Sequence, residues 1–339
     1  MSGSSSTPRV TIWTDAPYAA TVQQVLKHMD AAVFPVGVGG PRVPEVDQLA
    51  KQFNCPREDD LRKLLVEMPA SFVVLATVRD VEAKDLAYAT ASDTVVLTFE
   101  PIWADLDQLA QSNRTGKGKH QPIKTGSIVH LPRFDHCLGW ASAADPMAVL
   151  GTPRLVTFST YGGPNSPSLF ARLYDAWQIL RQLAPLPESV DASLISRDEH
   201  IPDSLPQMTG HLAIHARLTD GEHTAAAVID ASDQIPAESR QLRLVANKGQ
   251  LHVNDDSYAL HDEQGHLLDT LAPPSPRAEY ARLIAQQWLR ILEMPQKPDS
   301  NHDKAEDRDL LACCLACLLS ARTRQPESPR KLLELHALT

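Results

Sequence analysis

Short apolar runs alternate with helical stripes along the first third of the chain, and this alternation constrains the fold most strongly. The runs RVTIWT (9–14), FVVLAT (72–77) and TVVLT (94–98) are continuous and rich in β-branched residues. Uninterrupted apolar strands are typical of a parallel sheet that is buried on both faces. The segments between them carry apolar residues at helical spacing. This part of the chain is therefore predicted to be α/β, with a doubly wound parallel sheet. Further elements of the same kind are expected at 19–29, 32–38, 46–53 and 61–68.

The second half changes character, because strand-like runs now follow one another directly. These runs are at 156–161, 190–194, 212–218, 224–230, 241–246 and 250–254, and helices are expected at 167–183, 278–292 and 305–321. Consecutive strands indicate an antiparallel sheet, so this half is predicted to be α+β. LRLVANKGQLHVNDD is predicted to be a hairpin with Lys248-Gly249 at its turn.

The polar, basic stretch 112–125 is predicted to be a loop that ends the first domain. The resulting organisation is a disordered tail at 1–8, a first domain at 9–126 and a second domain at 127–339.

Composition limits the possible partners. The chain has 339 residues, which suits two domains, and 43% of them are hydrophobic. The net charge of -10 argues against a nucleic-acid partner. No apolar run approaches the roughly 20 residues that span a bilayer, so no membrane association is expected. Five cysteines without a regular framework indicate reduced thiols and a cytoplasmic location.

Three segments, in order, carry a resemblance to a known family. They are TFEPI (98–102), QLRLVANKGQLHVNDDSYALH (241–261) and DRDLLACCLACLLSARTRQ (307–325). Together they resemble the Gfo/Idh/MocA oxidoreductases over nearly the whole chain after Pro8. The resemblance implies a Rossmann-type domain followed by an α+β domain with an open, mostly antiparallel sheet. It also implies an NAD or NADP cofactor, a small sugar-like ligand and self-association through the open sheet as a homo-oligomer.

The expected cofactor turn lacks the residues that a dinucleotide needs. Such a turn uses glycines so that the backbone can approach the pyrophosphate at a helix N-terminus. The corresponding stretch here begins at Thr14 and reads TDAPYA (14–19), without a glycine. Ala19 is acceptable at the third glycine position, but Ala16 adds a methyl group where the pyrophosphate should pass. Asp15 would repel a diphosphate and is predicted to be a helix N-cap instead.

The second strand ends at Gly39 and Gly40, without the acidic residue that binds the adenosine ribose. These glycines are predicted to form either a plain turn or a loop near a phosphate. Thr77 matches the family pattern after the third strand. The nucleotide site is therefore predicted to be degenerate, with weak or no NAD(P) binding.

The family implies a catalytic lysine from a Glu-Lys-Pro signature and a histidine on a helix of the second domain. In this chain Glu100 stands at the lysine position. Aligned on the Leu-Arg-Gln-Leu end of the helix, Asp175 stands at the histidine position and Gln178 at that of an accompanying aspartate. Glu100 and Asp175 either form a new acid–base pair or are solvated remnants of a vestigial cleft.

Other clusters are predicted to be structural. His211 and His215 lie about 13 Å apart on a strand, which is too far for one metal ion. Cys313, Cys314 and Cys317 lie in an apolar helix and are expected to be core residues. Tyr161-Gly162-Gly163-Pro164, and the pair Arg133 and His136, lie where a ligand could be contacted. No metal is expected.

Three hypotheses follow. The first is a catalytically degenerate member of the family, a pseudoenzyme. The second is an active NAD(P)-dependent dehydrogenase with a remodelled site that uses Glu100, Asp175 or Tyr174. The third is a structural or binding subunit that associates through its open sheet.

Overall fold

The computed structural model describes two compact units that are built from alternating stretches of chain. The described residues are 7–77, 81–91, 94–114, 128–163, 167–196, 200–220, 223–272, 279–293 and 303–337. Unit 1 comprises Met1–Ile102, Gln108–Pro132 and Tyr280–Lys304, and unit 2 comprises Trp103–Asp107, Arg133–Glu279 and Ala305–Thr339. Residues 280–304 therefore belong with unit 1, although the sequence placed them in the domain 127–339.

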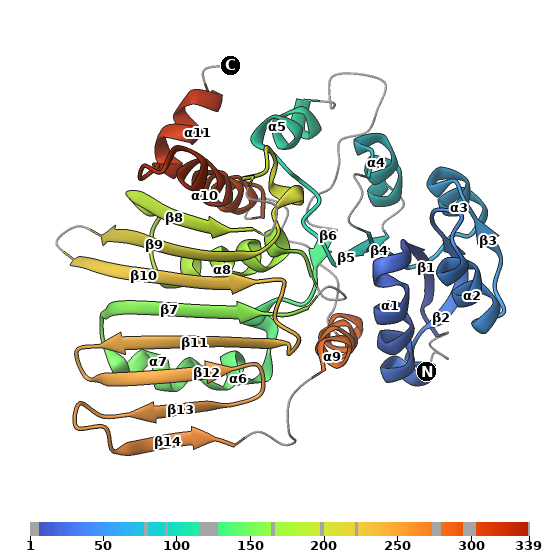
Figure 1. Cartoon of the computed structure of the whole chain (residues 1–339). Coiled ribbons are helices and arrows are strands. Elements are labelled where there is room, and N and C mark those ends of the chain that lie inside the picture. The colour runs from blue at the N-terminus through green and yellow to red at the C-terminus, as the bar shows by residue number, and fades with distance from the viewer. Residues whose placement is uncertain are drawn as a thin grey trace. The chain divides into compact units, whose positions relative to one another are not determined.

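Unit 1 contains a six-stranded parallel sheet in the order β3-β2-β1-β4-β5-β6 (Figure 1). The strands are β1 (Arg9–Thr14), β2 (Phe34–Gly39), β3 (Arg57–Glu58), β4 (Phe72–Ala76), β5 (Val95–Thr98) and β6 (Ile128–His130). The chain adds β2 and β3 on one side of β1 and then β4 to β6 on the other. Strand order thus reverses between β1 and β4, and ligands of open α/β sheets bind at the carboxyl ends of strands beside such a reversal.

One face of the unit 1 core is completed by a helix from late in the chain. Helix α9 (Tyr280–Glu293) packs with α1 (Ala16–Met29) and shares one buried cluster with β1 and β4. Trp288 on α9 is 1% exposed, and its ring lies 6.2 Å from that of Phe72 on β4. Burial of a side chain of this size contributes several kcal/mol, so α9 is an essential part of unit 1. The remaining helices of this part of the chain are α2 (Pro44–Gln52), α3 (Leu61–Glu67), α4 (Ala83–Ala91) and α5 (Leu106–Arg114).

Unit 2 is built on an eight-stranded sheet in the order β14-β13-β12-β11-β7-β10-β9-β8 (Figure 1). Its strands are β7 (Pro153–Tyr161), β8 (Ser189–Ile195), β9 (His211–Asp220), β10 (His223–Ser232), β11 (Ser239–Ala246), β12 (Gly249–Asn254), β13 (Tyr258–His261) and β14 (Leu267–Leu271). All neighbours are antiparallel except β7 and β10, which are parallel. The described helices are α6 (Leu138–Ser142), α7 (Ala144–Leu150), α8 (Leu169–Leu183), α10 (Asp303–Thr323) and α11 (Pro329–Ala337).

The two faces of the unit 2 sheet differ. Side chains such as Phe158 and Ile229 are buried on the face against which α8 packs. On the opposite face, a single row crosses all eight strands. The row is Thr270, Ala259, His252, Arg243, Thr157, Val228, His215 and Asp191. In the described part of unit 2, Figure 1 shows no helix of this unit against that face, which we call the bare face.

The architecture confirms the predicted fold class, and three details differ from the prediction. The hairpin turn is Asn247-Lys248, because Gly249 is already paired with Ala246 in the ladder. Gly249 is needed there because an added Cβ would lie 2.1 Å from the His261 carbonyl oxygen on β13. A third late helix, α11, follows α10. Ser112 to Arg114 belong to α5, and the rest of the predicted loop up to Thr125 lies outside the described residues, as do residues 1–6.

Helix α10, with 21 residues, is the longest described, and it carries seven charged residues. No described helix is long and apolar enough to cross a bilayer.

Candidate functional site

The first candidate region is the carboxyl edge of the unit 1 sheet. Asp15 follows β1, and its carboxylate Oδ2 accepts a hydrogen bond from the Thr77 hydroxyl at 2.9 Å. Thr77 directly follows β4, so this bond joins the two strands between which strand order reverses. The Asp15 N–H donates to the Ala76 carbonyl oxygen at 3.3 Å. Asp15 is 3% exposed and Thr77 is 4% exposed. The crevice beside β1 is thus bridged by protein groups.

Asp15 occupies the N-cap position of α1, as predicted, but its side chain makes no capping hydrogen bond. It faces Thr77 instead. Pro17, in the first turn of α1, has no N–H to offer an anion. Ala16 is half-buried and Ala19 is buried. The first turn therefore presents a carboxylate and fewer donors than a phosphate-binding turn does.

Packing accounts for Gly39, the last residue of β2, and for Gly40, which follows it. A Cβ on Gly39 would lie 2.7 Å from side-chain atoms of Leu64 and Trp13. Gly40 has φ +148°, and a Cβ there would lie 1.9 Å from the Thr14 carbonyl oxygen. The chain after β1 and the chain after β2 therefore lie in direct contact.

Glu100 follows β5 and is held by Tyr18 of α1. The Tyr18 hydroxyl donates a short hydrogen bond to the Glu100 carboxylate. Tyr18 is 2% exposed, and burial, followed by the nearby Glu100 charge, raises the pKa of its hydroxyl well above the ordinary value. Glu100 itself is half-buried. The residue at the family's lysine position therefore joins α1 to the end of β5.

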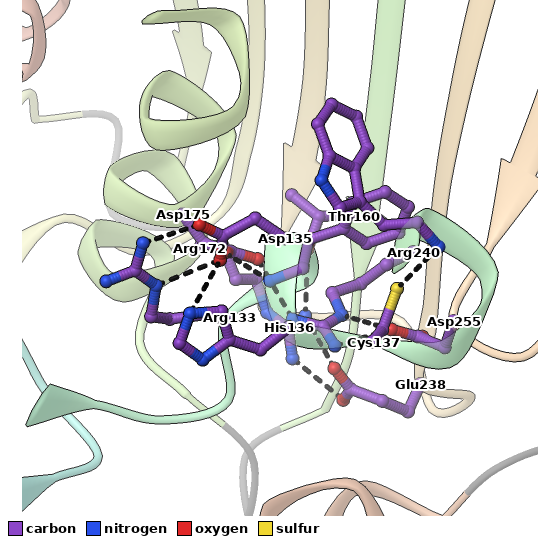
Figure 2. A network of polar contacts seen from close by, with 12 residues as sticks. Arg133, Asp135, His136, Cys137, Thr160, Arg172, Asp175, Glu238, Arg240 and Asp255 are labelled. Carbon is purple, nitrogen blue, oxygen red and sulfur yellow. Dashed lines mark hydrogen bonds and ion pairs between the residues drawn. The ribbon is translucent and has the colours of Figure 1, made fainter. Parts of the chain in front are cut away.

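The second candidate region is a buried polar network in unit 2, centred on Asp175 of α8 (Figure 2). Asp175 is 3% exposed, so the expectation of a solvated remnant is wrong for this residue. Its Oδ1 accepts from the Phe134 N–H at 2.8 Å, and its Oδ2 accepts from Arg240 Nη1 at 3.0 Å. Asp175 thus fixes the 3₁₀ turn Phe134–His136 and pairs with a guanidinium from β11.

Arg240 is shared by two carboxylates. It also donates to Asp255 at 2.9 Å and 2.5 Å, and its guanidinium carbon lies 5.5 Å above the Phe134 ring. Burial raises the pKa of Asp175 to about 6, and the Arg240 charge opposes this. Burial also raises the pKa of Asp255. Burial thus outweighs the Arg240 charge, and Asp175 holds a proton more readily than an exposed aspartate does.

A second buried arginine extends the same network. Arg172 of α8 donates to both carboxylate oxygens of Glu238 at 2.8 Å and to the Thr160 hydroxyl at 3.2 Å. Its side chain is 2% exposed. Arg172 and Arg240 thus connect α8 to the sheet and its adjoining loop through buried ion pairs. Such pairs are stabilising only while both partners are in place.

Gln178 lies one turn after Asp175 and is 6% exposed. With its carbonyl oxygen facing Arg133, it accepts from that guanidinium at 2.7 Å. Arg133 also pairs with Asp135 at 2.5 Å. Gln178, which stands at the position of the family's accompanying aspartate, therefore contacts Arg133 in the segment before α6.

The structure places the predicted residues in two separate groups. Thr14, Ala16, Ala19, Gly39, Thr77 and Glu100 lie in unit 1, and Asp175 and Gln178 lie in unit 2. The residues that sequence reasoning missed are Tyr18, Arg240 and Asp255. Arg240 carried a signal, since it precedes Leu242 and Leu244 on the inward side of an alternating strand.

The other predicted clusters are accounted for as follows. Cys313, Cys314 and Cys317 are fully buried, which confirms the prediction of core cysteines. His211 pairs with Asp230 at 3.3 Å. Among the described residues, no group of three or more His, Cys, Asp or Glu side chains is placed to hold a metal ion.

No family model matches the sequence. No curated protein matches it either. Solved structures match over nearly the full length. The GenD2 protein from gentamicin A biosynthesis, in complex with NAD, is 16% identical with a TM-score of 0.68, covering 95% of this chain and 97% of that one.

Two further structures are similar. An oxidoreductase from Agrobacterium radiobacter, in complex with NAD+, L-tartaric acid and magnesium, is 13% identical with a TM-score of 0.67, covering 96% and 100% of the two chains. UDP-N-acetylglucosamine 3-dehydrogenase GnnA from Acidithiobacillus ferrooxidans is 13% identical with a TM-score of 0.64, covering 93% and 98%.

These matches define the class: the chain has the two-domain fold of this group of dehydrogenases and oxidoreductases. The fold predicted from the Gfo/Idh/MocA resemblance is therefore confirmed. NAD is present in two of these similar structures, as their descriptions state.

The residues of this chain do not fit the diphosphate of such a cofactor. Asp15 brings a carboxylate to the crevice beside β1, its N–H is bonded to Ala76, and Pro17 lacks an N–H. We therefore derive no step through a nicotinamide cofactor.

Proposed function

We propose that this chain is a non-catalytic homologue of NAD(P)-dependent oxidoreductases, in which the positions of the reacting side chains have become structural contacts. The observation that supports this most is Asp175. Both of its carboxylate oxygens accept hydrogen bonds inside unit 2, from the Phe134 N–H and from Arg240. A general base must reach the proton of a substrate, and this carboxylate is directed into the protein interior. Glu100, bonded to Tyr18, supports the same proposal.

The test is a search for turnover. The purified chain is incubated with NAD+ or NADP+ and a panel of sugars, sugar acids and nucleotide sugars, and reduced nicotinamide is followed by absorbance. We expect no turnover above that of heat-treated protein. Turnover with any of these compounds would reject the proposal.

The active alternative has a specific observation in its favour, which is the pKa of Asp175, raised by burial to about 6 and thus close to that of a histidine. If turnover is found, its pH profile distinguishes the two cases. An inflection near pH 6 that disappears in Asp175→Asn would assign the proton transfer to Asp175. An unchanged inflection would assign it to another group.

We propose further that the chain self-associates through the bare face of unit 2. This face spans eight strands, and its half-buried apolar residues Leu155, Val228 and Val245 lie near its centre. Sedimentation velocity at neutral pH should give a species of at least twice the chain mass. Arg243→Glu and Val228→Asp together should reduce it to one chain, whereas Lys51→Glu on α2 should not. A single-chain species for the unmodified protein would reject this proposal.

A further inference from the structure

The carboxyl edge of unit 1 carries a feature that goes beyond loss of catalysis. In open α/β sheets the ligand enters the crevice at the strand-order reversal, here between β1 and β4. The Asp15–Thr77 hydrogen bond crosses this crevice, and the parallel bond from the Asp15 N–H to Ala76 lies beside it. The Asp15 N–H bond continues the ladder between β1 and β4, whereas Asp15 and Thr77 directly follow these strands. A side-chain hydrogen bond therefore spans the carboxyl edge of the sheet at the point of strand-order reversal.

The Asp15 carboxylate is negatively charged, like the diphosphate that binds at this edge in dinucleotide-binding folds. A diphosphate at a helix N-terminus is stabilised by the helix dipole and by hydrogen-bond donors. Asp15 brings a carboxylate to the N-cap position of the 14-residue helix α1, and this carboxylate accepts a hydrogen bond from the Thr77 hydroxyl. Asp15 and Thr77 are both nearly fully buried, so this carboxylate is shielded from solvent.

The other side of the turn is closed as well. Gly40 approaches the Thr14 carbonyl oxygen so closely that a Cβ would lie 1.9 Å from it. The turn is thus fixed by β4 on one side and by the loop after β2 on the other. A ligand phosphate at this turn would therefore meet the Asp15 carboxylate.

We propose that the Asp15 carboxylate is an intramolecular anion that takes the place of a ligand diphosphate, so that unit 1 is complete without a nucleotide and excludes one by charge. The inference concerns binding, whereas the proposed function concerns turnover. The two can therefore fail separately: a protein that binds nucleotide without turnover would overturn only this inference.

The test compares Asp15→Asn with the unmodified chain. Asparagine keeps the size and a hydrogen-bond acceptor for Thr77 but removes the charge. Inorganic pyrophosphate, ADP and NADH are titrated by calorimetry and by thermal shift. We expect no saturable response from the unmodified chain at millimolar ligand. For Asp15→Asn we expect pyrophosphate and ADP to bind at least about tenfold more tightly, because repulsion between like charges in a buried site is removed.

Thr77→Val is the matched control. It breaks the same hydrogen bond but retains the carboxylate. We expect a lowered melting temperature and no gain in pyrophosphate binding, which separates charge from simple loosening of the turn. Asp15→Gly, which also restores a glycine, should bind ADP at least as tightly as Asp15→Asn.

Three outcomes would overturn the inference. Saturable pyrophosphate or NADH binding by the unmodified chain would show that Asp15 excludes nothing. Equal affinity of the unmodified chain and a folded Asp15→Asn for pyrophosphate would also show that Asp15 excludes nothing. Equal gains for Asp15→Asn and Thr77→Val would assign the effect to loosening and not to charge.

Discussion

The carboxyl edge of unit 1 and the buried network of unit 2 hold their carboxylates in different ways. In unit 1 the contacts join a carboxylate to a neutral hydroxyl, as in Asp15–Thr77 and Glu100–Tyr18. In unit 2 they join carboxylates to guanidinium groups, as in Asp175–Arg240 and Glu238–Arg172. A buried ion network depends on every member, because removing one leaves an uncompensated charge. A hydrogen bond from a neutral hydroxyl to a carboxylate contributes less, so its loss should cost less. Unit 2 should therefore be the more sensitive region, in both stability and pH response.

The largest expected effect comes from Arg240→Met. It leaves Asp175 and Asp255 buried without their cation, which should lower the free energy of unfolding by about 3–5 kcal/mol at pH 7.5. The loss should shrink as the pH falls, because burial raises the pKa values of both carboxyls and protonation removes their charge. The change in the free energy of unfolding is measured by urea titration, and hydrogen exchange of α8 reports the local effect. Arg243→Met, three residues further along β11 and on the bare face, should change stability by less than about 0.5 kcal/mol.

Next in size is Gly40→Ala in unit 1. The new Cβ meets the Thr14 carbonyl oxygen, and the backbone has φ +148°, so we expect a loss of about 2–3 kcal/mol. Gly265→Ala is the control, since its φ is +87° and no atom lies within 4 Å of the added Cβ. It should lose about 1 kcal/mol from backbone strain alone. Equal losses in the two variants would mean that the β1 and β2 loops do not press together.

Asp175→Asn should alter the pH dependence more than the stability at any one pH. The pKa of Asp175 is raised to about 6 in the folded protein, above an unfolded value of about 4. Its contribution is therefore full below pH 4 and is lost as the pH rises through 6. The stability of the unmodified chain relative to the variant should thus fall by about 1–3 kcal/mol between pH 4 and pH 7. A difference in stability between the two proteins that stays constant from pH 4 to pH 7 would show that Asp175 does not titrate in this range.

The smallest expected effect is that of Tyr18→Phe. It removes the hydrogen bond to Glu100 and should cost about 1 kcal/mol, with little dependence on pH between 5 and 8. Thermal unfolding at those two pH values measures it. Glu100→Gln retains an acceptor and should lose less than Tyr18→Phe does. A strong pH dependence for Tyr18→Phe would remove the contrast between the two units.

The parts of this molecule that the sequence predicts are those with a local signal. Continuous apolar strands in unit 1 and consecutive strands in unit 2 determine the two sheets, and the alternation in β11 also places Arg240 inward. The partners of the buried groups have no such signal. Asp15 and Thr77 are 62 residues apart, and Asp175 and Arg240 are 65 apart. The partner of a buried acid depends on how distant segments pack, so neither alternative for Asp175, a pair with Glu100 or a solvated remnant, included its contact with Arg240.

Helix α9 has a consequence for the order in which the protein can be made. Ribosomes add residues at about 5–20 per second, so roughly 10–30 s separate the appearance of β6 from that of the whole of α9. During that interval the nascent first unit has six strands but no Trp288 against Phe72. Its apolar surface on α1 stays uncovered while all of unit 2 up to β14 is synthesised. Unit 2 in turn needs Ala305–Thr339, which is made after α9, so neither unit can complete its core before the last part of the chain is synthesised. A chain cut before Tyr280 should therefore need a chaperone.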